Sequence, residues 1–479
     1  MDLAGLLSLP VELIHHLSSF LAVEDVLSCS MTCHFLRAAL NYNTVWKRYL
    51  PEPDLTRLES LEQHVQPAFH PEQTFTPLCE YWTHFMRKTR LLKNWRQGNV
   101  VDYGVKPSYN YADGRHNALK GRGQVIYQDR YLFLGRFIND YESDAIEVWD
   151  IDKVPVLDST LEIKDINYDS FFIVGTSLVV VACSIVNVHK ITIPDKKYPL
   201  WFSFSITEDD VTFHQQHQHT GRHNERCIGW SHWTVDQYLV SNKCGENVFH
   251  IWDMLKACKV GSFFSPFDGF SISVHSYIKN QWILSQNVHF ANGYYLLKFN
   301  FENKSFSDSV FKFDSYSQHI IVYNSHVIVF KNADKSNSEG WYDTVCTVHD
   351  FDTSVELRKR RFNNANKNYL LQSTAVVNGK FVILCFDCFQ IIDALSLETV
   401  DHFQCDLNIK FIVHHFNLYG SVFVVTSNDK YILDMWDVTK KRKVPIKLRA
   451  VYTNPLCYDG TFTKLIFMMY SKIHVYRFW

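Results

Sequence analysis

The chain has 479 residues, and its 48 Lys and Arg nearly balance its 50 Asp and Glu. This balance excludes the overall basic composition that is typical of nucleic-acid-binding domains, so we expect no nucleic-acid partner. Hydrophobic residues form 46% of the chain and aromatic residues 15%, which excludes global disorder and favours strands. The first residues do not have the pattern of a secretory signal, no apolar run reaches the roughly 18 residues of a membrane span, and 12 Cys are scattered. We therefore expect a cytoplasmic protein with reduced thiols and no membrane association, with a nuclear pool as the alternative.

The N-terminal residues 5–50 have a helical pattern. Apolar residues recur at helical spacing after Pro10, which suits the first turn of a helix. They are Leu13, Ile14, Leu17, Phe20 and Leu21. Glu24 and Asp25 then place acids at the start of a second segment, where the helix dipole favours them. This pattern predicts a small all-α domain.

Residues 51–98 are interpreted as a linker. Five prolines between residues 51 and 80 predict an irregular stretch. A helical segment follows from about Leu78 to Trp95 and ends at Gly98.

After residue 99 the hydrophobic period changes to two. Short β-branched runs bounded by turns, such as 178–183, 381–385 and 422–426, predict buried strands. Residues 99–479 therefore form a predicted all-β domain.

One register aligns eight segments of this domain, each with an apolar residue, a large residue and usually a charged residue. They are Val148-Trp149-Asp150, Val188-His189-Lys190, Ile251-Trp252-Asp253, Leu296-Leu297-Lys298, Val348-His349-Asp350, Ile391-Ile392-Asp393, Met435-Trp436-Asp437 and Val475-Tyr476-Arg477. Their middle residues are 40, 63, 45, 52, 43, 44 and 40 positions apart. A period in the forties with Trp-Asp at a strand end is typical of a four-stranded propeller blade. Dividing residues 116–479 by eight gives about 45 residues per blade and by seven gives 52, so we favour eight degenerate WD-like blades, with seven as the alternative.

The end of the chain predicts how the ring closes. Trp479 directly follows a predicted third strand, and a propeller does not leave such an edge unpaired. We therefore predict that a segment near Asn99–Lys106 supplies the missing outer strand.

The N-terminal pattern resembles an F-box. The residues that carry the resemblance are Leu9, Pro10, Glu12, Ile14, Ser19, Phe20, Leu21, Asp25, Leu27, Cys33, Val45 and Trp46. The stretch from Asn94 to Gly98 is similar to one that many F-box/WD-repeat proteins carry just before the propeller, and Trp95 is expected to bury against the propeller rim. The order F-box (5–50), linker (51–98) and WD-repeat-like propeller (99–479) resembles that family along nearly the whole chain.

The resemblance implies a function without chemistry of its own. It implies that the F-box binds a Skp-type adaptor and, through it, the cullin and RING subunits of an SCF-type ubiquitin ligase, while the propeller holds a protein substrate. No G-x-S-x-G, H-E-x-x-H or phosphate-binding loop is present, so we predict no enzyme, no catalytic residue and no cofactor. Two alternatives are a propeller scaffold that recruits no ligase and an enzyme with its active site in the propeller channel.

The candidate adaptor-binding residues are apolar. A module of about 40 residues cannot bury such a face alone, so part of it is left for a partner. The candidates are Leu9, Pro10, Ile14, Leu17, Leu21, Leu27 and Trp46. The alternative is that these residues pack on the propeller.

Propellers of this family usually bind ligands on the face built from the loops before first strands and between second and third strands. The candidate substrate-binding residues are the cations predicted to lie there. They are Arg115, Arg122, Arg136, Arg222, Arg226 and Lys243. If they converge, a phosphorylated or acidic degron would fit, because Arg binds phosphate through two hydrogen bonds. The alternative is a set of dispersed surface charges.

Three other features receive structural interpretations. The cluster of His214, His217, His219, His223 and Cys227 is read as a solvated loop rather than a metal site, so no metal is predicted. Cys385 and Cys388 are predicted to flank a turn in the sixth blade. The basic runs 358–361 and 440–443 are each predicted to occupy a turn between a third and a fourth strand.

Overall fold

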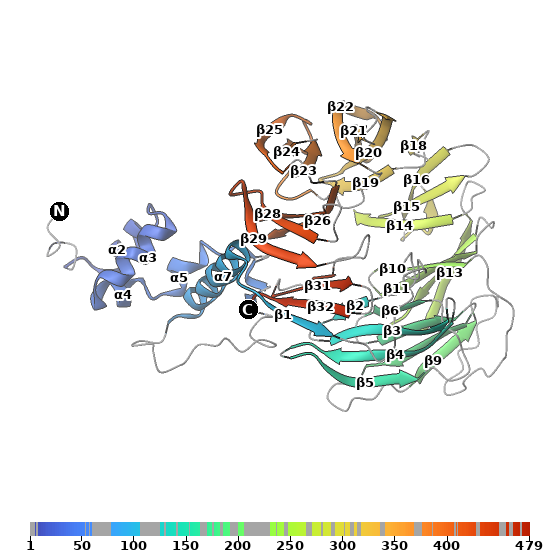
Figure 1. Ribbon diagram of the computed structural model, residues 1–479, viewed down its shortest axis with the longest axis horizontal. Helices are drawn as coiled ribbons and strands as arrows, with labels where there is room; N and C mark the ends of the chain where they lie inside the picture. The colour runs from blue at the N-terminus through green and yellow to red at the C-terminus, as the bar shows by residue number, and fades with distance from the viewer. Residues whose placement is uncertain are drawn as a thin grey trace.

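The structure is a computed structural model of the whole chain (Figure 1). The residues that it describes are 5, 8–52, 54–56, 58–59, 78–105, 125–128, 131–139, 142–152, 154–162, 170–174, 177–182, 185–191, 200–205, 230–235, 237–243, 248–264, 271–278, 281–288, 293–300, 302–306, 311–313, 318–335, 341–367, 376–385, 387–406, 409, 411–427, 432–449, 457–458, 463–469 and 472–479.

Short helices form the N-terminal part, as predicted. They are α2 (Val11–Ser18), α3 (Val23–Thr32), α4 (His34–Leu40) and α5 (Asn43–Lys47). Pro10 stands directly before α2, and its φ of −55° is already near the helical value. Glu24 and Asp25 lie in the first turn of α3, where the dipole stabilises them.

A longer helix, α7 (Glu80–Gln97), connects these helices to the β-rich body (Figure 1). It ends at Gly98, which has a positive φ of 65° and donates its N–H to the carbonyls of the last turn. A Cβ at this position would lie 2.9 Å from the carbonyl oxygen of Pro445. Glycine is therefore required both for the backbone turn and for the close approach to the sheet.

The described strands form eight sheets that follow one another around the body, which confirms eight propeller blades rather than seven. Blades 1 to 4 contain β2 (Val125–Gln128), β3 (Tyr131–Asn139), β4 (Glu142–Asp150), β5 (Val156–Glu162); β6 (Ser170–Val174), β7 (Ser177–Ala182), β8 (Ile185–Lys190), β9 (Leu200–Ser205); β10 (Trp230–Val235), β11 (Tyr238–Lys243), β12 (Val248–Asp253), β13 (Cys258–Phe264); and β14 (Ser271–Ile278), β15 (Gln281–Val288), β16 (Gly293–Asn300), β17 (Ser305–Phe306), β18 (Phe311–Phe313).

The remaining blades complete the ring. Blades 5 to 8 contain β19 (Gln318–Tyr323), β20 (His326–Lys335), β21 (Trp341–Asp350), β22 (Glu356–Lys367); β23 (Lys380–Cys385), β24 (Cys388–Asp393), β25 (Thr399–Gln404); β26 (Phe411–Leu418), β27 (Ser421–Ser427), β28 (Ile432–Asp437), β29 (Arg442–Arg449); and β30 (Cys457–Tyr458), β31 (Lys464–Met469), β32 (Lys472–Arg477), β1 (Val101–Val105).

The predicted ring closure is confirmed. Strand β1 pairs antiparallel with β32, from Val101 opposite Arg477 to Val105 opposite Ile473. The strand that directly follows α7 is thus the outer strand of the last blade. A side-chain hydrogen bond also joins the two strands, since Nδ1 of His474 on β32 lies 2.9 Å from a carboxylate oxygen of Asp102 on β1.

Seven of the repeated triplets lie in third strands, and the one in blade 6 lies in β24, the middle of the three strands described there. The Asp residues have a structural role. All five Asp side chains at the third position accept backbone N–H groups of the turn that follows, as Asp253 does from Leu255 and Lys256 at 3.0 Å. In five blades the pairing with the fourth strand shifts between the first and second residue of the triplet. The repeat therefore encodes a capped turn and a bulge rather than a binding site.

The fourth triplet needs a correction. Leu296-Leu297-Lys298 does not end its strand, since β16 continues to Asn300. The side chain of Asn300 accepts the backbone N–H groups of Glu302 and Asn303, so Phe299-Asn300 occupies the place of Trp-Asp in this blade. An amide oxygen accepts these hydrogen bonds as a carboxylate does, which is why the charge pattern missed it.

The basic runs also need a correction. Residues 358–361 lie inside strand β22 and not in the preceding turn, because the turn is already complete at Val355. The second run, 440–443, spans the turn and the first two residues of β29. The predicted turn between Cys385 and Cys388 is confirmed, since these residues pair directly across β23 and β24.

Candidate functional site

The outward face of α2 exposes a stripe of large apolar side chains. Leu13, Leu17, Phe20 and Leu21 are 48%, 43%, 75% and 40% exposed. Their spacing of four, three and one residues places them on one side of the helix and the turn that follows. We call these four residues the α2 stripe. An exposed patch of this kind on a small module marks a protein interface.

The structure divides the predicted adaptor-binding residues into two groups. Pro10, Leu17 and Leu21 are exposed, and Leu9 and Leu27 are partly buried. Ile14 and Trp46 are buried in the core, so in this conformation they hold the helices from inside and touch no partner. Sequence reasoning did not nominate Leu13 and Phe20, although both belong to the helical period.

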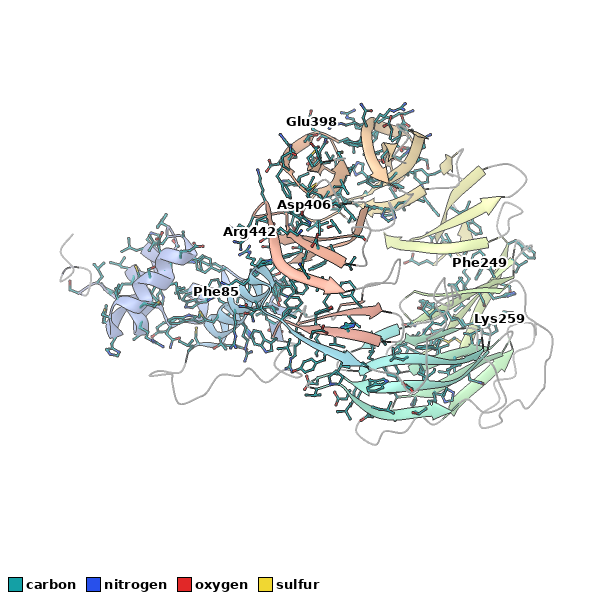
Figure 2. The ribbon with its side chains drawn as sticks, viewed as in Figure 1. Phe85, Phe249, Lys259, Glu398, Asp406 and Arg442 are labelled. Carbon is teal, nitrogen blue, oxygen red and sulfur yellow. The ribbon has the colours of Figure 1, made fainter. Side chains whose placement is uncertain are left out.

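Trp46 connects the short helices to α7. Its ring stacks on Trp82 with centroids 4.7 Å apart and packs against Phe85 at 5.2 Å. Its indole nitrogen donates a hydrogen bond to the carbonyl oxygen of Leu40 at 2.8 Å. Figure 2 shows Phe85 at this junction, between the N-terminal helices and the β-rich body.

Trp95 makes the corresponding connection to the propeller. It is fully buried, as expected, and stacks on Phe478 with centroids 3.8 Å apart. Phe416 and Phe423 of blade 7 pack against the same ring at 5.0 and 5.7 Å. The end of α7 therefore lies on both of the last two blades.

Polar contacts fix the same helix end. The side-chain amide of Asn94 donates to the carbonyl oxygen of Phe478 at 2.7 Å. The guanidinium of Arg96 donates to the buried carboxylate of Asp437 at 2.9 Å and to the hydroxyl of Ser421 at 2.8 Å. Hydrogen bonds to a charged group in a partly buried site are among the stronger ones. The stretch from Asn94 to Gly98 is thus a docking element for the propeller.

One hydrophobic cluster runs through all three parts of the chain. It includes Ile14 of α2, Trp46 of α5, Trp95 of α7 and Phe478 after the last strand. Because a close-packed core resists sliding of its segments, this cluster packs the helices firmly against blades 7 and 8.

The side chains of all six candidate substrate-binding residues lie outside the described residues, so their convergence stays a prediction. Arg136 lies in β3 and Lys243 is the last residue of β11, and their side chains are outside the described residues. Arg115, Arg122, Arg222 and Arg226 lie wholly outside them, as does the histidine-rich segment 214–227.

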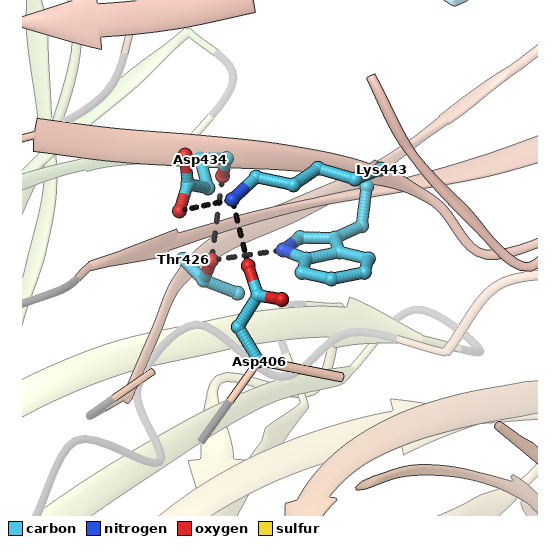
Figure 3. Close-up of polar contacts among 5 residues, drawn as sticks. Asp406, Thr426, Asp434 and Lys443 are labelled. Carbon is cyan, nitrogen blue, oxygen red and sulfur yellow. Dashed lines mark hydrogen bonds and ion pairs between the residues drawn. The ribbon is translucent and has the colours of Figure 1, made fainter. Parts of the chain in front are cut away.

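Three residues of blade 7 and Asp406, from the segment between blades 6 and 7, form a compact polar cluster with Lys443 (Figure 3). The ammonium of Lys443 donates to carboxylates of Asp406 at 2.7 Å and Asp434 at 2.9 Å. The indole N–H of Trp436 donates to the hydroxyl of Thr426 at 3.2 Å. Burial lowers the pKa of Lys443, but its hydrogen bonds to the two carboxylates outweigh this effect and raise it. Every charge is paired, so the cluster ties the outer strand of the blade in place and offers no free base.

Two cysteines and the possible metal ligands complete the account of the described reactive groups. Burial raises the pKa of the Cys385 and Cys405 thiols to about 12, which keeps them protonated. Within the described residues, no three His, Cys, Asp or Glu side chains are grouped as metal ligands. No helix among them is both long and apolar enough for a bilayer.

Comparisons with known proteins agree with this division of the chain. An F-box-like family model matches residues 6–58. The chain carries an F-box-like domain ahead of a β-propeller. A solved structure described as the Dos1 propeller is similar over 81% of this chain and 97% of its own length, with a TM-score of 0.52 and 9% identity, which shows the fold alone. No curated protein sequence matches the chain.

Proposed function

We propose that this protein is the substrate-recognition subunit of an SCF-type ubiquitin ligase. In this proposal the F-box-like domain binds a Skp-type adaptor and, through it, cullin and RING subunits, while the propeller binds the substrate. The observation that carries the proposal is the exposed α2 stripe on a domain that matches an F-box-like model.

Such a receptor acts by position rather than by chemistry. Binding substrate and ligase on one chain raises the effective concentration of substrate lysines near the ubiquitin-charged enzyme. The contacts of Trp46 and Trp95 support this role, because they pack the helices that carry the adaptor-binding surface firmly against the propeller.

Binding of the purified full chain to a purified Skp-type adaptor tests the proposal. The variant Leu17→Ala/Leu21→Ala should weaken binding about tenfold or more, because it truncates the apolar contact. Its melting temperature should stay near that of the wild type, because both residues are exposed. Ser28→Ala, on the exposed side of α3, is the matched control. Absence of binding by the wild-type chain would disprove the proposal.

The substrate is proposed to carry a phosphorylated or acidic degron. This part rests on the six candidate cations, for which Arg136→Glu and Arg222→Glu are the test variants. Loss of substrate capture by both variants is the expected result, and unchanged capture would disprove this part alone.

One observation favours a scaffold that recruits no ligase. Leu9 and Leu27, both candidate adaptor contacts, pack against the cluster that continues into the propeller. In a scaffold this packing would be the purpose of the helices. The adaptor-binding measurement separates the two functions, because only the ligase receptor binds the adaptor.

A further inference from the structure

The outer strand of blade 5 forms a long open edge. Strand β22 has 12 residues and is the longest described strand, whereas every other described outer strand has eight residues or fewer. It lies at the end of its sheet, and none of the described strands pairs with its outer edge (Figure 1). Such an edge presents backbone N–H and C=O groups that can pair with another chain.

The first half of β22 is accessible on both of its faces. Successive side chains of a strand point to opposite faces of the sheet. From Glu356 to Arg361 none of the six side chains is buried, and Phe362 is the first buried residue of the strand. From Arg358 to Phe362 the strand pairs with β21 without a bulge. A regular, accessible edge of this kind is a template for a further strand.

Positive charge is concentrated on the same half of the strand. Residues 358–361 are all Arg or Lys, and Glu356 is the one acid among residues 356–361. Like charges that face each other across two strands destabilise their pairing. A second copy of β22 would place cations opposite cations in this stretch. The charges therefore oppose self-association and favour an acidic strand as the partner.

Two of the four cations are already held by neighbouring side chains. The guanidinium of Arg360 donates to the hydroxyl of Thr399 on blade 6 at 2.8 Å. The guanidinium of Arg361 donates to the carboxylate of Asp343 on β21 at 2.8 Å. These two residues support the strand from its two faces.

Arg358 and Lys359 are the cations left for a partner. Both are exposed, and in the part of the chain that the structure describes no carboxylate pairs with either of them. Because they are adjacent, they project on opposite faces of the strand. A partner strand with two adjacent acids can pair with both. Leu357, which is 41% exposed, offers an apolar contact next to them.

We infer that β22 binds an extended acidic segment of another protein, which adds to blade 5 as a further strand. The segment carries two adjacent acids, which pair with Arg358 and Lys359, and an aliphatic residue beside them. In this mode backbone hydrogen bonds supply the affinity and side-chain pairs supply the specificity. The inference does not depend on adaptor binding, and it uses residues other than the six candidate substrate-binding cations.

The apolar residues of this edge favour a polypeptide over a nucleic acid. Val355 and Leu357 are 56% and 41% exposed beside the cations. None of residues 355–361 is aromatic, whereas single-stranded nucleic acids are commonly bound by stacking bases on aromatic rings. An acidic segment with aliphatic residues matches both the charge and the apolar surface of the strand.

Binding of synthetic peptides to the purified full chain tests the inference. The probe is about ten residues long, with two adjacent aspartates among valines and threonines, and the same peptide with two asparagines is the reference. The variant Arg358→Glu/Lys359→Glu should weaken binding of the acidic peptide about tenfold or more, because both attractive pairs become repulsive. Its melting temperature should stay near that of the wild type, because both side chains are exposed. Lys440→Glu/Lys447→Glu makes the same charge change on exposed residues of blade 7 and is the matched control.

Two altered peptides test the pairing itself. A peptide with two lysines in place of the aspartates should bind Arg358→Glu/Lys359→Glu better than it binds the wild type. Methylation of the backbone nitrogens in the middle of the acidic peptide removes the donors that strand addition needs, so it should abolish binding.

Each of several results would overturn the inference. The acidic peptide might bind no better than its asparagine reference, which would show that the charges only keep copies of the edge apart. Equal losses from the blade 7 control would show attraction without a site, and binding of the methylated peptide would exclude strand addition. Displacement of the peptide by a single-stranded oligonucleotide at lower concentration would identify a nucleic-acid site instead. Adaptor binding by the same variants should be unchanged, so failure of this inference leaves the proposed function standing.

Discussion

The F-box-like helices and the propeller differ in where their large apolar residues are exposed to solvent. Among the described residues of the propeller, the exposed ones are spread over the outer strands and turns of separate blades, as with Val156, Leu255 and Val400. In the helices, seven such residues lie between Leu13 and Tyr42. The propeller satisfies its core by closing a ring, whereas a helical module of this size leaves apolar surface for a partner. Exposure that is concentrated in one short segment therefore supports the proposed adaptor contact.

The largest effect is expected from removing the strand that closes the ring, because the propeller's core depends on that closure. Deleting residues 99–106 removes β1, so β32 loses its outer partner and blade 8 becomes an open edge. We expect a sharp fall in melting temperature and loss of a single cooperative transition, measured by calorimetry. An unchanged melting curve would show that the ring does not need this strand.

Trp95→Ala should have the next largest effect. It removes the stack on Phe478 and leaves a cavity beneath α7, with an expected cost of about 3–5 kcal/mol in the free energy of unfolding. Chemical denaturation measures this cost. Gln97→Ala, on the exposed side of the same helix, is the control and should change little.

Arg96→Met tests the polar part of the same joint. It keeps the aliphatic stem but leaves the buried Asp437 carboxylate without its charged partner, at a cost of about 2–4 kcal/mol. The double variant Arg96→Met/Asp437→Asn should recover part of the loss, because it removes the unpaired charge. Failure of the double variant to recover stability would mean that the ion pair is not the cause.

The α2 stripe should show the opposite behaviour. Leu17→Ala should change the free energy of unfolding by less than about 1 kcal/mol, because the residue is exposed, yet it should weaken adaptor binding. Denaturation and binding are measured on the same preparation. A large loss of stability would show that Leu17 supports the fold instead.

The smallest effect concerns the turn caps. Hydrogen bonds from backbone N–H groups, the one of Ser396 first, lower the pKa of Asp393 in the folded state. The stability from this cap is therefore present above the unfolded pKa of about 3.9 and is lost as pH falls through the lower folded value. Asp393→Asn should flatten the acid part of the stability curve below about pH 4, but only slightly, because this side chain remains partly exposed to solvent. Denaturation at pH 3 and pH 6 measures it, and an identical slope would contradict the assignment.

Local patterns were sufficient for much of the fold. The change of period near residue 99, the spacing of triplets such as the one at Trp436, and the end of the chain at Trp479 predicted the helices, the eight blades and the closing strand. They failed where a different residue type makes the same hydrogen bond. At Asn300, the side-chain amide oxygen accepts the backbone N–H that an aspartate accepts in other blades. They also failed for Arg358 to Arg361, because a charged run occurs equally in a turn and on an outer strand.

The sequence by itself determined that α2 is amphipathic and that Trp95 precedes the propeller. Only the tertiary structure decided that Leu13 faces outward while Ile14, one position on, faces the core. It also decided that Trp46 supports the surface from within, and that Asn94 meets Phe478. The two residues of each contact lie far apart along the chain. Their contact depends on how whole helices and sheets pack, and the local spacing of apolar residues carries no information about that packing.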